Sequence, residues 1–243
     1  MVRCYDAAMR KHRDFWNKEY QTAEHLALST TPAEDLEKFT RFVERREGKK
    51  QLNPMALAVD MGCGNGRNLV YLNKVYGMRG VGYDISDEAI KQAVGLSEGM
   101  PIRYETRTIE GDFADLKDGS ASVVLDMMSS HFLKASERAH LRDEIVRILR
   151  PGGWLFFKSF LGEGDLNAQR MLKEYPAGEG EDNAYIHPKL GVYEYVWRDA
   201  EALKEFFEPY FEVHKIEKSH RHLDRHGRAN KRRTVSVYLQ KLG

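Results

Sequence analysis

The stretch LAVDMGCGNGR, from Leu57 to Arg67, constrains the fold of this chain more than any other segment. It starts as a short apolar strand and then breaks into Gly62, Gly64 and Gly66 before a helical pattern begins near Arg67. Glycine suits such a turn because it tolerates positive φ and leaves the backbone open to a ligand. The helix start would offer unpaired N–H groups and a positive dipole end. A strand, a glycine turn and a helix in this order indicate a nucleotide-binding crevice, with a plain tight turn as the alternative.

Two details narrow the kind of nucleotide site. A GxGxxG dinucleotide fingerprint would need glycine at position 67, where this chain has Arg67, which disfavours a NAD-dependent dehydrogenase. The acidic Asp60 lies just before the turn, where it can accept hydrogen bonds from a ligand or from the turn itself. The run from Asp60 to Gly66 resembles motif I of the class I S-adenosylmethionine-dependent methyltransferases, an acidic residue followed by GxGxG.

A second acidic residue follows the next predicted strand. The segment GVGYDIS ends that strand in Asp84, about twenty positions beyond the glycine turn. In a doubly wound fold this spacing brings a carboxylate against the ribose, whose hydroxyls need such an acceptor. Alternatively, Asp84 caps the helix that begins near Ser86, although residues 86–88 could cap it equally well. We favour ribose binding, with Ile85 packed on the adenine face.

Two further predicted strands are followed by residues that are candidates for contacts with the cofactor. Ile102 to Ile109 fits a third strand, which leads to GDFADL. The family pattern implies adenine contacts at Asp112 and Phe113, and a turn with a solvated Asp112 is the alternative. SASVVLDMM has the apolar character of a buried parallel strand and is followed by residues 126–131. Because ligands bind at the carboxyl ends of such strands, these residues should face the transferring methyl group.

The remaining landmarks predict the whole fold. LRPGGWLFFKSF is similar to the LkPGG turn that precedes the fifth strand of the family, so the match spans about residues 55–160. Phe211 to Ser219 and Thr234 to Gln240 are the predicted last strands. The resemblance implies an α/β, Rossmann-like class I methyltransferase fold. Its sheet has seven strands and is mostly parallel, with an antiparallel last strand and helices on both faces.

Composition sets outer limits on the protein. A chain of 243 residues is long enough for one sizeable α/β domain, and we predict a single domain over residues 1–243. The net charge of +1 implies no polyelectrolyte partner. There is no apolar run of roughly 18 residues, so no membrane span is predicted. Cys4 and Cys63 have no metal-type spacing, so we expect no metal site, and a cytoplasmic setting is the simplest interpretation.

The N-terminal 50 residues are predicted to be helical. Ala33 to Glu47 has apolar residues at helical spacing. Upstream, the segment FWNKEYQTAEH resembles the Trp/Tyr segment that precedes the first strand in many small-molecule methyltransferases, including tellurite-resistance-type enzymes. That resemblance implies an N-terminal lid over residues 1–50 with cofactor contacts at Trp16 and Tyr20. Ordinary packing of a helix on the sheet is the alternative.

Residues 161–198 are predicted to form an insertion over the active site. The segment is rich in Gly, acidic residues and Tyr, and long loops in compact domains are usually functional or mobile. Tyr185, Tyr193 and Tyr195 are the predicted substrate wall, together with Trp197. A small packed subdomain with buried tyrosines is an equally weighted alternative.

A dense basic segment, residues 220–233, connects the last two strands. It is expected to emerge on the cofactor side, because the last strand runs antiparallel to the one before it. A solvated hairpin is one interpretation, and a docking surface for a phosphate, a carboxylate or nucleic acid is the other. Arg221 and Arg225 are the predicted substrate contacts, followed by Arg228, Lys231 and Arg232.

The chemistry of methyl transfer from a sulfonium requires few catalytic groups. The protein must hold the acceptor in near-attack geometry and exclude water, and it needs a base only if the acceptor loses a proton. His131 is the first candidate base, His187 the second, and Asp126 would orient the acceptor or support the cofactor. Carried onto matching positions, the resemblance implies cofactor contacts at Asp60, Gly62, Cys63, Gly64, Gly66, Asn68, Asp84, Ile85, Asp112, Phe113, Asp126, Met127, Trp16 and Tyr20.

The residues after the fourth strand also narrow the acceptor. Amino-methylating DNA or RNA enzymes usually carry a (D/N/S)PP(Y/F) motif there, but residues 126–129 read DMMS. A C5-cytosine enzyme needs a nucleophilic cysteine, and neither Cys4 nor Cys63 is placed for that role. The sequence therefore predicts an S-adenosylmethionine-dependent methyltransferase acting on a small, potentially anionic molecule. The alternatives are a tRNA methyltransferase docking through residues 220–233 and a non-catalytic cofactor-binding module.

Overall fold

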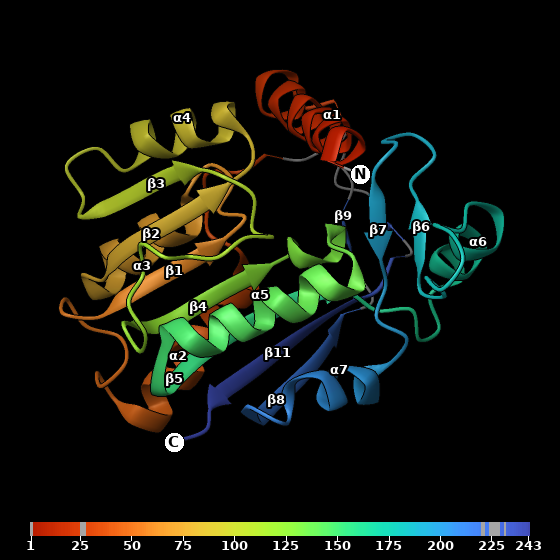
Figure 1. The fold of residues 1–243 in the computed structure, drawn as a ribbon. Coiled ribbons are helices and arrows are strands. Elements are labelled where there is room, and N and C mark those ends of the chain that lie inside the picture. The colour runs from red at the N-terminus through yellow and green to blue at the C-terminus, as the bar shows by residue number, and fades with distance from the viewer. Residues whose placement is uncertain (1, 25–27, 220–221, 224–228, 231) are drawn as a thin grey trace.

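A seven-stranded sheet forms the centre of the molecule. The computed structural model describes residues 2–24, 28–219, 222–223, 229–230 and 232–243. The strands of the sheet are β1 (Leu57–Met61), β2 (Arg79–Asp84), β3 (Ile102–Thr106), β4 (Ala121–Met127), β5 (Leu149–Phe160), β8 (Phe211–Ser219) and β11 (Thr234–Lys241). Their order is β3-β2-β1-β4-β5-β11-β8 (Figure 1). The first five pair in parallel, and β11 runs antiparallel to both β5 and β8. The predicted fold class is confirmed.

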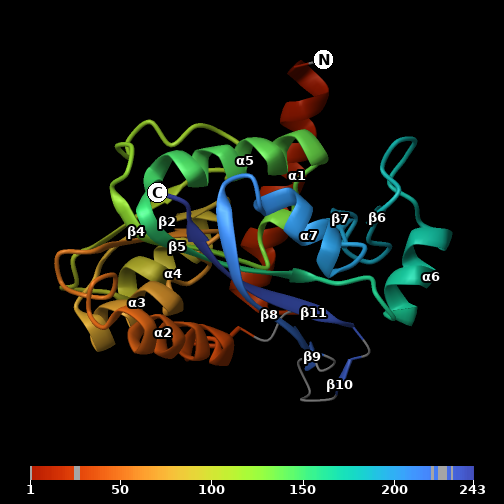
Figure 2. The same ribbon diagram turned by 90° about the horizontal axis from the view of Figure 1, so that it is seen from below.

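Helices cover both faces of this sheet. They are α1 (Val2–Thr22), α2 (Glu34–Glu47), α3 (Arg67–Tyr76), α4 (Asp87–Leu96), α5 (Ala135–Ile148), α6 (Leu166–Glu174) and α7 (Ala200–Phe207), with a 3₁₀ turn η1 (Ser130–Phe132). Viewed from below, α2, α3 and α4 lie on one side of the sheet and α5 and α7 on the other (Figure 2). None of the helices in the described ranges is long and apolar enough to cross a membrane.

The strands build two cores because successive side chains point to opposite faces. Ala58 belongs to a core with α2 and α3, in which Phe39 stacks on Phe156 at 4.9 Å between ring centroids. Val59, its neighbour in β1, belongs to the other core, with α5 and α7. Each fully buried aromatic or aliphatic side chain contributes roughly 1.5–3 kcal/mol. The two cores fix the sheet, and the sheet in turn fixes the carboxyl ends of its strands.

The predicted turn at residues 151–153 lies within β5 instead of before it. Leu149 already pairs with Ala121, whereas Trp154 pairs with Val123, so the intervening residues of β5 bulge out of register with β4. Other predicted boundaries agree closely with the structure. The strand before the glycine turn spans Leu57–Met61, and α3 ends at Gly77, which adopts the left-handed conformation at the C-cap.

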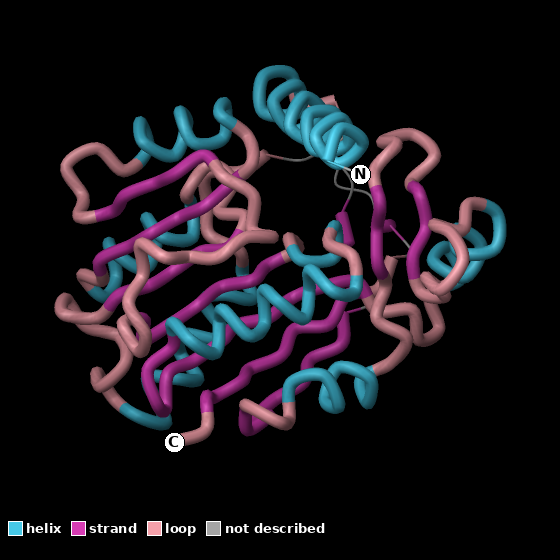
Figure 3. Tube along the Cα trace, in the orientation of Figure 1, coloured by secondary structure: helices cyan, strands magenta, loops and turns pink. Residues whose placement is uncertain are grey.

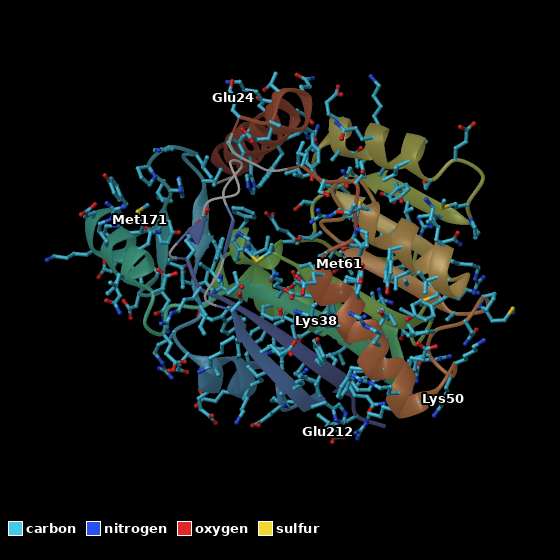
Figure 4. All side chains as sticks on the ribbon, turned by 180° about the vertical axis from the view of Figure 1, so that it is seen from behind. Glu24, Lys38, Lys50, Met61, Met171 and Glu212 are labelled. Carbon is cyan, nitrogen blue, oxygen red and sulfur yellow. The ribbon has the colours of Figure 1, made fainter. Side chains whose placement is uncertain are left out.

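The predicted insertion has secondary structure of its own. It contains α6 and a hairpin of β6 (Ala184–Ile186) and β7 (Tyr193–Tyr195) (Figure 3). A third core joins Phe160 to Ala168, Met171, Tyr185 and Val196, and Figure 4 shows Met171 on α6 at this flank of the molecule. In the basic segment, β9 (His222–Leu223) pairs with β10 (Ala229–Asn230). The predicted contacts Arg221 and Arg225, like Arg228 and Lys231, lie outside the described residues.

Candidate active site

The glycine turn is packed too closely for side chains at two of its positions. Gly62 and Gly64 have φ values of +78° and +54°, a region that favours glycine. A Cβ atom on Gly62 would lie 2.6 Å from the Cβ atom of Ser129, and one on Gly64 would lie 2.3 Å from the Tyr20 hydroxyl oxygen. Ser129 and Tyr20 therefore pack directly against the backbone of the turn, which only glycine permits at these two positions.

Asp84 ties the end of β2 to this turn. Its Oδ2 atom accepts a hydrogen bond from the Gly64 N–H at 2.9 Å, and its Oδ1 atom accepts one from the Ser86 N–H at 2.9 Å. Ser86 is the N-cap of α4, because its hydroxyl oxygen accepts from the Ala89 N–H at 3.1 Å. The carboxylate of Asp84 therefore does not cap α4. Burial raises its pKa to about 6, against the opposing effect of backbone hydrogen bonds from Ser86, Gly64 and Ile85.

Asp60 carries an unpartnered oxygen at the end of β1. The residue is 1% exposed, and its Oδ2 atom has no hydrogen-bond partner within the described part of the chain. Burial raises the pKa of Asp60 to about 7; a hydrogen bond with Asn68 opposes this rise, and the charges of Asp84 and Asp126 add to it. The Asn68 Oδ1 atom is likewise buried and unpartnered, while the Asn68 amide donates to Met127 Sδ at 3.5 Å.

Asp126 supports the loop that follows β4. Its Oδ1 atom accepts a hydrogen bond from the Ser130 N–H at 3.1 Å, and burial raises its pKa to about 6. Met128, next in the loop, has a φ of +63°, an unfavourable conformation for a residue with a side chain. Such strain clusters at functional sites. Asp126 thus holds η1, which carries His131, at the carboxyl end of β4.

His131 is a neutral buried imidazole. It is 2% exposed, and burial lowers its pKa to about 3. Its Nδ1 atom has no hydrogen-bond partner among the described residues. The ring packs on Phe132 at 4.0 Å and against Phe160 at 4.9 Å between centroids. The ring is therefore unprotonated at neutral pH.

Helix α1 places Trp16 and Tyr20 at two different parts of this edge of the sheet. The Tyr20 hydroxyl lies over Gly64, and the Trp16 ring packs on Phe132 at 5.3 Å. The helix is attached to α4: Asn17 Oδ1 accepts a hydrogen bond from the Ser86 hydroxyl at 2.7 Å, and Gln92 Nε2 donates to the Tyr20 carbonyl at 2.7 Å. Figure 1 shows α1 beside the carboxyl ends of the parallel strands.

Asp112 and Phe113 lie apart from the three carboxylates. Asp112 has a side chain 76% exposed and pairs with His140 at 2.9 Å. Phe113 is fully buried in the core on the α5 face, where its ring packs on Tyr83 at 4.8 Å and Arg107 covers it at 5.0 Å. An adenine contact with the Phe113 ring would need these side chains to move. Cys63, in the turn itself, is buried, and burial raises the pKa of its thiol.

The tyrosines of the insertion have partners within the protein. Tyr185 is fully buried and donates a hydrogen bond to Glu194, while Arg232 Nη2 donates to the Tyr185 oxygen at 2.7 Å. The Tyr193 hydroxyl donates to Glu181 Oε2 at 2.6 Å. Tyr195 and His187 also belong to the hairpin, and the His187 Nδ1 atom accepts from the Leu190 N–H at 3.3 Å. Tyr185 thus has the buried environment of the packed-subdomain alternative.

Two residues near His131 were missed by the sequence interpretation. Arg138, on α5, is 6% exposed, and its guanidinium carbon lies 3.4 Å from the centroid of the Tyr195 ring. His12, on α1, packs against Phe132 at 5.4 Å, and burial lowers its pKa to about 4. Nothing in the local sequence distinguishes Arg138 from the exposed charges of an amphipathic helix. Arg138 is covered by Tyr195 of the insertion, a contact that the sequence of α5 alone does not indicate.

The residues at the carboxyl edge fit S-adenosylmethionine. Three buried carboxylates (Asp60, Asp84 and Asp126) have raised pKa values, so a positively charged ligand beside them would restore their ionised forms. Asp84 is also a suitable acceptor for ribose hydroxyls, and the unpartnered oxygen atoms of Asp60 and Asn68 can accept further hydrogen bonds. The turn itself has no side chain at Gly62 and Gly64, where Ser129 and Tyr20 are the nearest groups.

Comparison with known proteins agrees with this fit. Residues 59–157 match the methyltransferase domain family. The chain is 27% identical over 169 residues to a glycine/sarcosine/dimethylglycine N-methyltransferase of Actinopolyspora halophila, which covers 64% of this chain but only 30% of that protein. The chain thus spans less than a third of the length of that relative.

Solved structures share the fold. An S-adenosylmethionine-dependent methyltransferase from Methanosarcina mazei superposes with a TM-score of 0.66 at 20% identity, covering 79% of this chain and 95% of that one. A geranyl diphosphate methyltransferase, solved with geranyl diphosphate and sinefungin, gives a TM-score of 0.64 at 11% identity, covering 97% and 100%. With the sheet order, these results show that the chain has the Rossmann-like fold of the class I S-adenosylmethionine-dependent methyltransferases and that residues 59–157 of it match the methyltransferase domain family.

Proposed function

We propose that this protein transfers a methyl group from S-adenosylmethionine to a small-molecule acceptor. The observation that carries the proposal is the set of three buried carboxylates around the glycine turn. Asp60, Asp84 and Asp126 end three neighbouring strands, β1, β2 and β4. Burial raises all three pKa values, although the Arg67 charge opposes the rise at Asp60; such burial is costly for the folded state and suits a ligand with a positive charge.

The roles of the residues follow from their positions. When bound, S-adenosylmethionine supplies a methyl group already activated by its sulfonium charge. Asp84 would hold the ribose, and Asp60 with Asn68 would hold polar groups near the methionine end. Asp126 positions η1 through the Ser130 N–H. Helix α1 and the rings of Trp16 and Phe132 would exclude water from the reacting atoms, which favours a near-attack geometry.

His131 is the residue best suited to remove a proton from the acceptor. Its imidazole is neutral at physiological pH and has an unpartnered Nδ1 atom. It follows β4, at the edge of the sheet where ligands bind in open α/β folds. His187 is a weaker candidate, because its Nδ1 atom already accepts a backbone hydrogen bond within the hairpin.

A small acceptor is supported by two independent facts. The residues after β4 lack the paired prolines of amino-methylating nucleic-acid enzymes. The matched relative is named for the methylation of glycine, sarcosine and dimethylglycine, all small molecules. We extend the small-molecule class, but not those particular acceptors, to this chain. The insertion with α6 and the β6–β7 hairpin would form the lid over the acceptor.

The proposal is tested in two steps. Calorimetric titration should detect binding of S-adenosylhomocysteine and none of NADH. The protein is then incubated with methyl-labelled S-adenosylmethionine and a cell extract divided by ultrafiltration into small molecules and macromolecules. Label should enter the small-molecule filtrate. Label in RNA alone, with a steep salt dependence, would instead identify an RNA methyltransferase docking through residues 220–233. Cofactor binding without transfer to either pool would indicate a non-catalytic module.

A further inference from the structure

A second group of buried polar side chains lies next to the loop that Asp126 holds, and its charged members have a net positive charge. It consists of His131 in η1, Arg138 in α5, Glu194 in β7 and Arg232 before β11, and we refer to it as the histidine–arginine cluster. The charges of Glu194, Arg232 and Arg138 all act on the His131 imidazole, which shows that the four groups are neighbours. They come from four segments that are far apart in the sequence.

Aromatic rings give this cluster an apolar wall. The guanidinium carbon of Arg232 lies 3.3 Å from the centroid of the Phe160 ring. Phe160 packs against His131 at 4.9 Å, and His131 packs on Phe132 at 4.0 Å between centroids. Trp16 on α1 then packs on Phe132 at 5.3 Å. These contacts link Arg232, just before β11, through Phe160, His131 and Phe132 to Trp16 on α1.

The cluster has more positive than negative charge. Glu194 forms an ion pair with Arg232, with 3.0 Å between Oε2 and Nη2, and it also accepts the Tyr185 hydroxyl. Arg138 has no ion-pair partner within the described ranges; its guanidinium donates to the Leu133 carbonyl and stacks on Tyr195.

Among the described residues, Glu181 reaches Arg138 only through a tyrosine hydroxyl. Glu181 accepts the Tyr193 hydroxyl at 2.6 Å, and that hydroxyl stands between it and Arg138. A buried guanidinium without a counter-ion is costly, so the cluster lacks one carboxylate to balance the charge of Arg138.

Two nitrogen atoms of the cluster are also without partners. Arg232 Nε and His131 Nδ1 are both buried and form no hydrogen bond in the described part of the chain. Buried polar atoms in folded proteins are nearly always paired, and an unpaired one at a ligand site is explained when the ligand supplies the partner. Arg232 has a side chain only 11% exposed, so its Nε atom cannot rely on bulk solvent.

We propose that the histidine–arginine cluster is the acceptor subsite and that it takes a small carboxylate with a planar or apolar body. The carboxylate would supply the missing counter-charge to Arg138 and a hydrogen-bond acceptor for Arg232. The rings of Phe132, Phe160 and Trp16 would contact the apolar body. This inference rests on the proposed function, because an acceptor subsite has meaning only in a methyltransferase. It assigns acceptor recognition to Arg138 and Arg232, in place of the predicted contacts Arg221 and Arg225.

The test separates acceptors by charge before the reaction. The small-molecule filtrate of a cell extract is passed over a strong anion exchanger at about pH 11, where amino groups are uncharged and a carboxylate keeps its negative charge. The retained and unretained pools are then incubated separately with the protein and methyl-labelled S-adenosylmethionine. Label should enter the retained pool only. Pretreatment of that pool with alkaline phosphatase should leave the labelling unchanged, because a carboxylate, unlike a phosphate ester, survives it.

Variants test the two arginines directly. Arg138→Gln and Arg232→Gln should each reduce labelling of the retained pool about tenfold or more, since each leaves a buried anion without a charged partner. Arg232→Lys should recover part of this loss. Arg142→Gln is the matched control: Arg142 is also largely buried and stacks on the Phe206 and Tyr210 rings, at 4.6 and 4.9 Å, but it packs against α7. Binding of S-adenosylhomocysteine should be unchanged in all four variants, which shows that they are folded.

Each contrary result has a distinct meaning. Label in the unretained pool, or labelling abolished by phosphatase, overturns the carboxylate assignment and leaves the proposed function intact. Equal labelling by Arg138→Gln, Arg232→Gln and the wild-type protein overturns the assignment of the subsite. Absence of label from both pools, with S-adenosylhomocysteine still bound, overturns the proposed function and this inference with it.

Discussion

Asp84 and Gly64 are joined by a hydrogen bond of 2.9 Å between the carboxylate and the backbone N–H. This bond closes the glycine turn against the end of β2, so a side chain expected to contact the cofactor also holds the cofactor's cradle in shape. The same carboxylate accepts the Ser86 N–H. One residue therefore couples the conformation of the turn to the start of α4.

Replacement of Asp84 should weaken cofactor binding. Asp84→Ala removes the charged acceptor for ribose hydroxyls and leaves the Gly64 N–H unpaired, so the affinity for S-adenosylhomocysteine should fall by about 1–3 kcal/mol. Titration calorimetry measures this change. Asp87→Asn, in the exposed first turn of α4, is the matched control and should bind like the wild-type protein. Unchanged affinity in Asp84→Ala would remove the ribose assignment.

The raised pKa of Asp60 predicts a stability difference that depends on pH. The folded pKa of about 7 lies above the ordinary value of 3.8, so the folded protein binds more protons than the unfolded chain between these values. Stability from this group is therefore fully present below about pH 4 and is lost as pH rises through 7. Asp60→Asn removes this loss. The free energy of unfolding of the variant, relative to that of the wild-type protein, should therefore rise by about 1 kcal/mol per pH unit between pH 5 and 7.

Urea unfolding of the two proteins without cofactor, at several pH values, measures this difference. The histidines with lowered pKa values, His12 and His131, affect both proteins alike and cancel in the comparison. A difference that stays constant from pH 5 to 8 would show that Asp60 titrates normally.

The positions of the glycine turn and its neighbouring carboxylates could be predicted from the sequence because their signals are local. The glycine turn, Asp60 and Asp84 lie within or next to predicted strands, and parallel strands bring their carboxyl ends together whatever the rest of the chain does. Phe113 shows the limit of the same reasoning. Its position in the motif is clear, but the packing of Tyr83 and Arg107 around it depends on the core of the α5 face.

The proposed acceptor subsite could not be predicted from the sequence because it is built from distant segments. Arg138 lies in an amphipathic helix, where charged residues are usually exposed, and only the β6–β7 hairpin makes it buried. The hairpin itself was predicted as a long loop, since strands of three residues are too short for a periodic signal. The buried pair of Glu194 and Arg232 joins positions 38 residues apart, and no local pattern indicates such a contact.

Helix α1 should control release of the cofactor. Asn17 Oδ1 accepts the Ser86 hydroxyl at 2.7 Å and so attaches α1 to the helix that begins beside Asp84. Asn17→Ala should speed dissociation of S-adenosylhomocysteine about fivefold, the equivalent of a lost hydrogen bond of about 1 kcal/mol. Stopped-flow displacement measures the rate. Lys18→Ala, whose side chain is 61% exposed on the same helix, should dissociate like the wild-type protein. Equal rates for both variants would argue against a lid.

His131 should be required for turnover and dispensable for cofactor binding. His131→Gln removes a neutral imidazole from the end of β4, and a lost general base typically costs about 10²–10⁴ in rate, so kcat should fall by at least about 100-fold. Because the pKa of His131 is about 3, the wild-type imidazole stays unprotonated from pH 5 to 8, and its protonation should not limit kcat in that range. The affinity for S-adenosylhomocysteine should stay within about twofold of the wild-type value.

A second buried histidine provides the control for this prediction. His214 has a side chain 5% exposed, packs on Trp154 at 4.8 Å and bonds to Gln240 at 3.0 Å; it lies in β8, the outermost strand, three strands away from β4. His214→Gln should keep its kcat even if its unfolding temperature falls. An active His131→Gln would mean that the acceptor needs no base, because the sulfonium alone then suffices for transfer. Loss of cofactor binding in His131→Gln would instead assign the imidazole to the packing of η1 on Phe160.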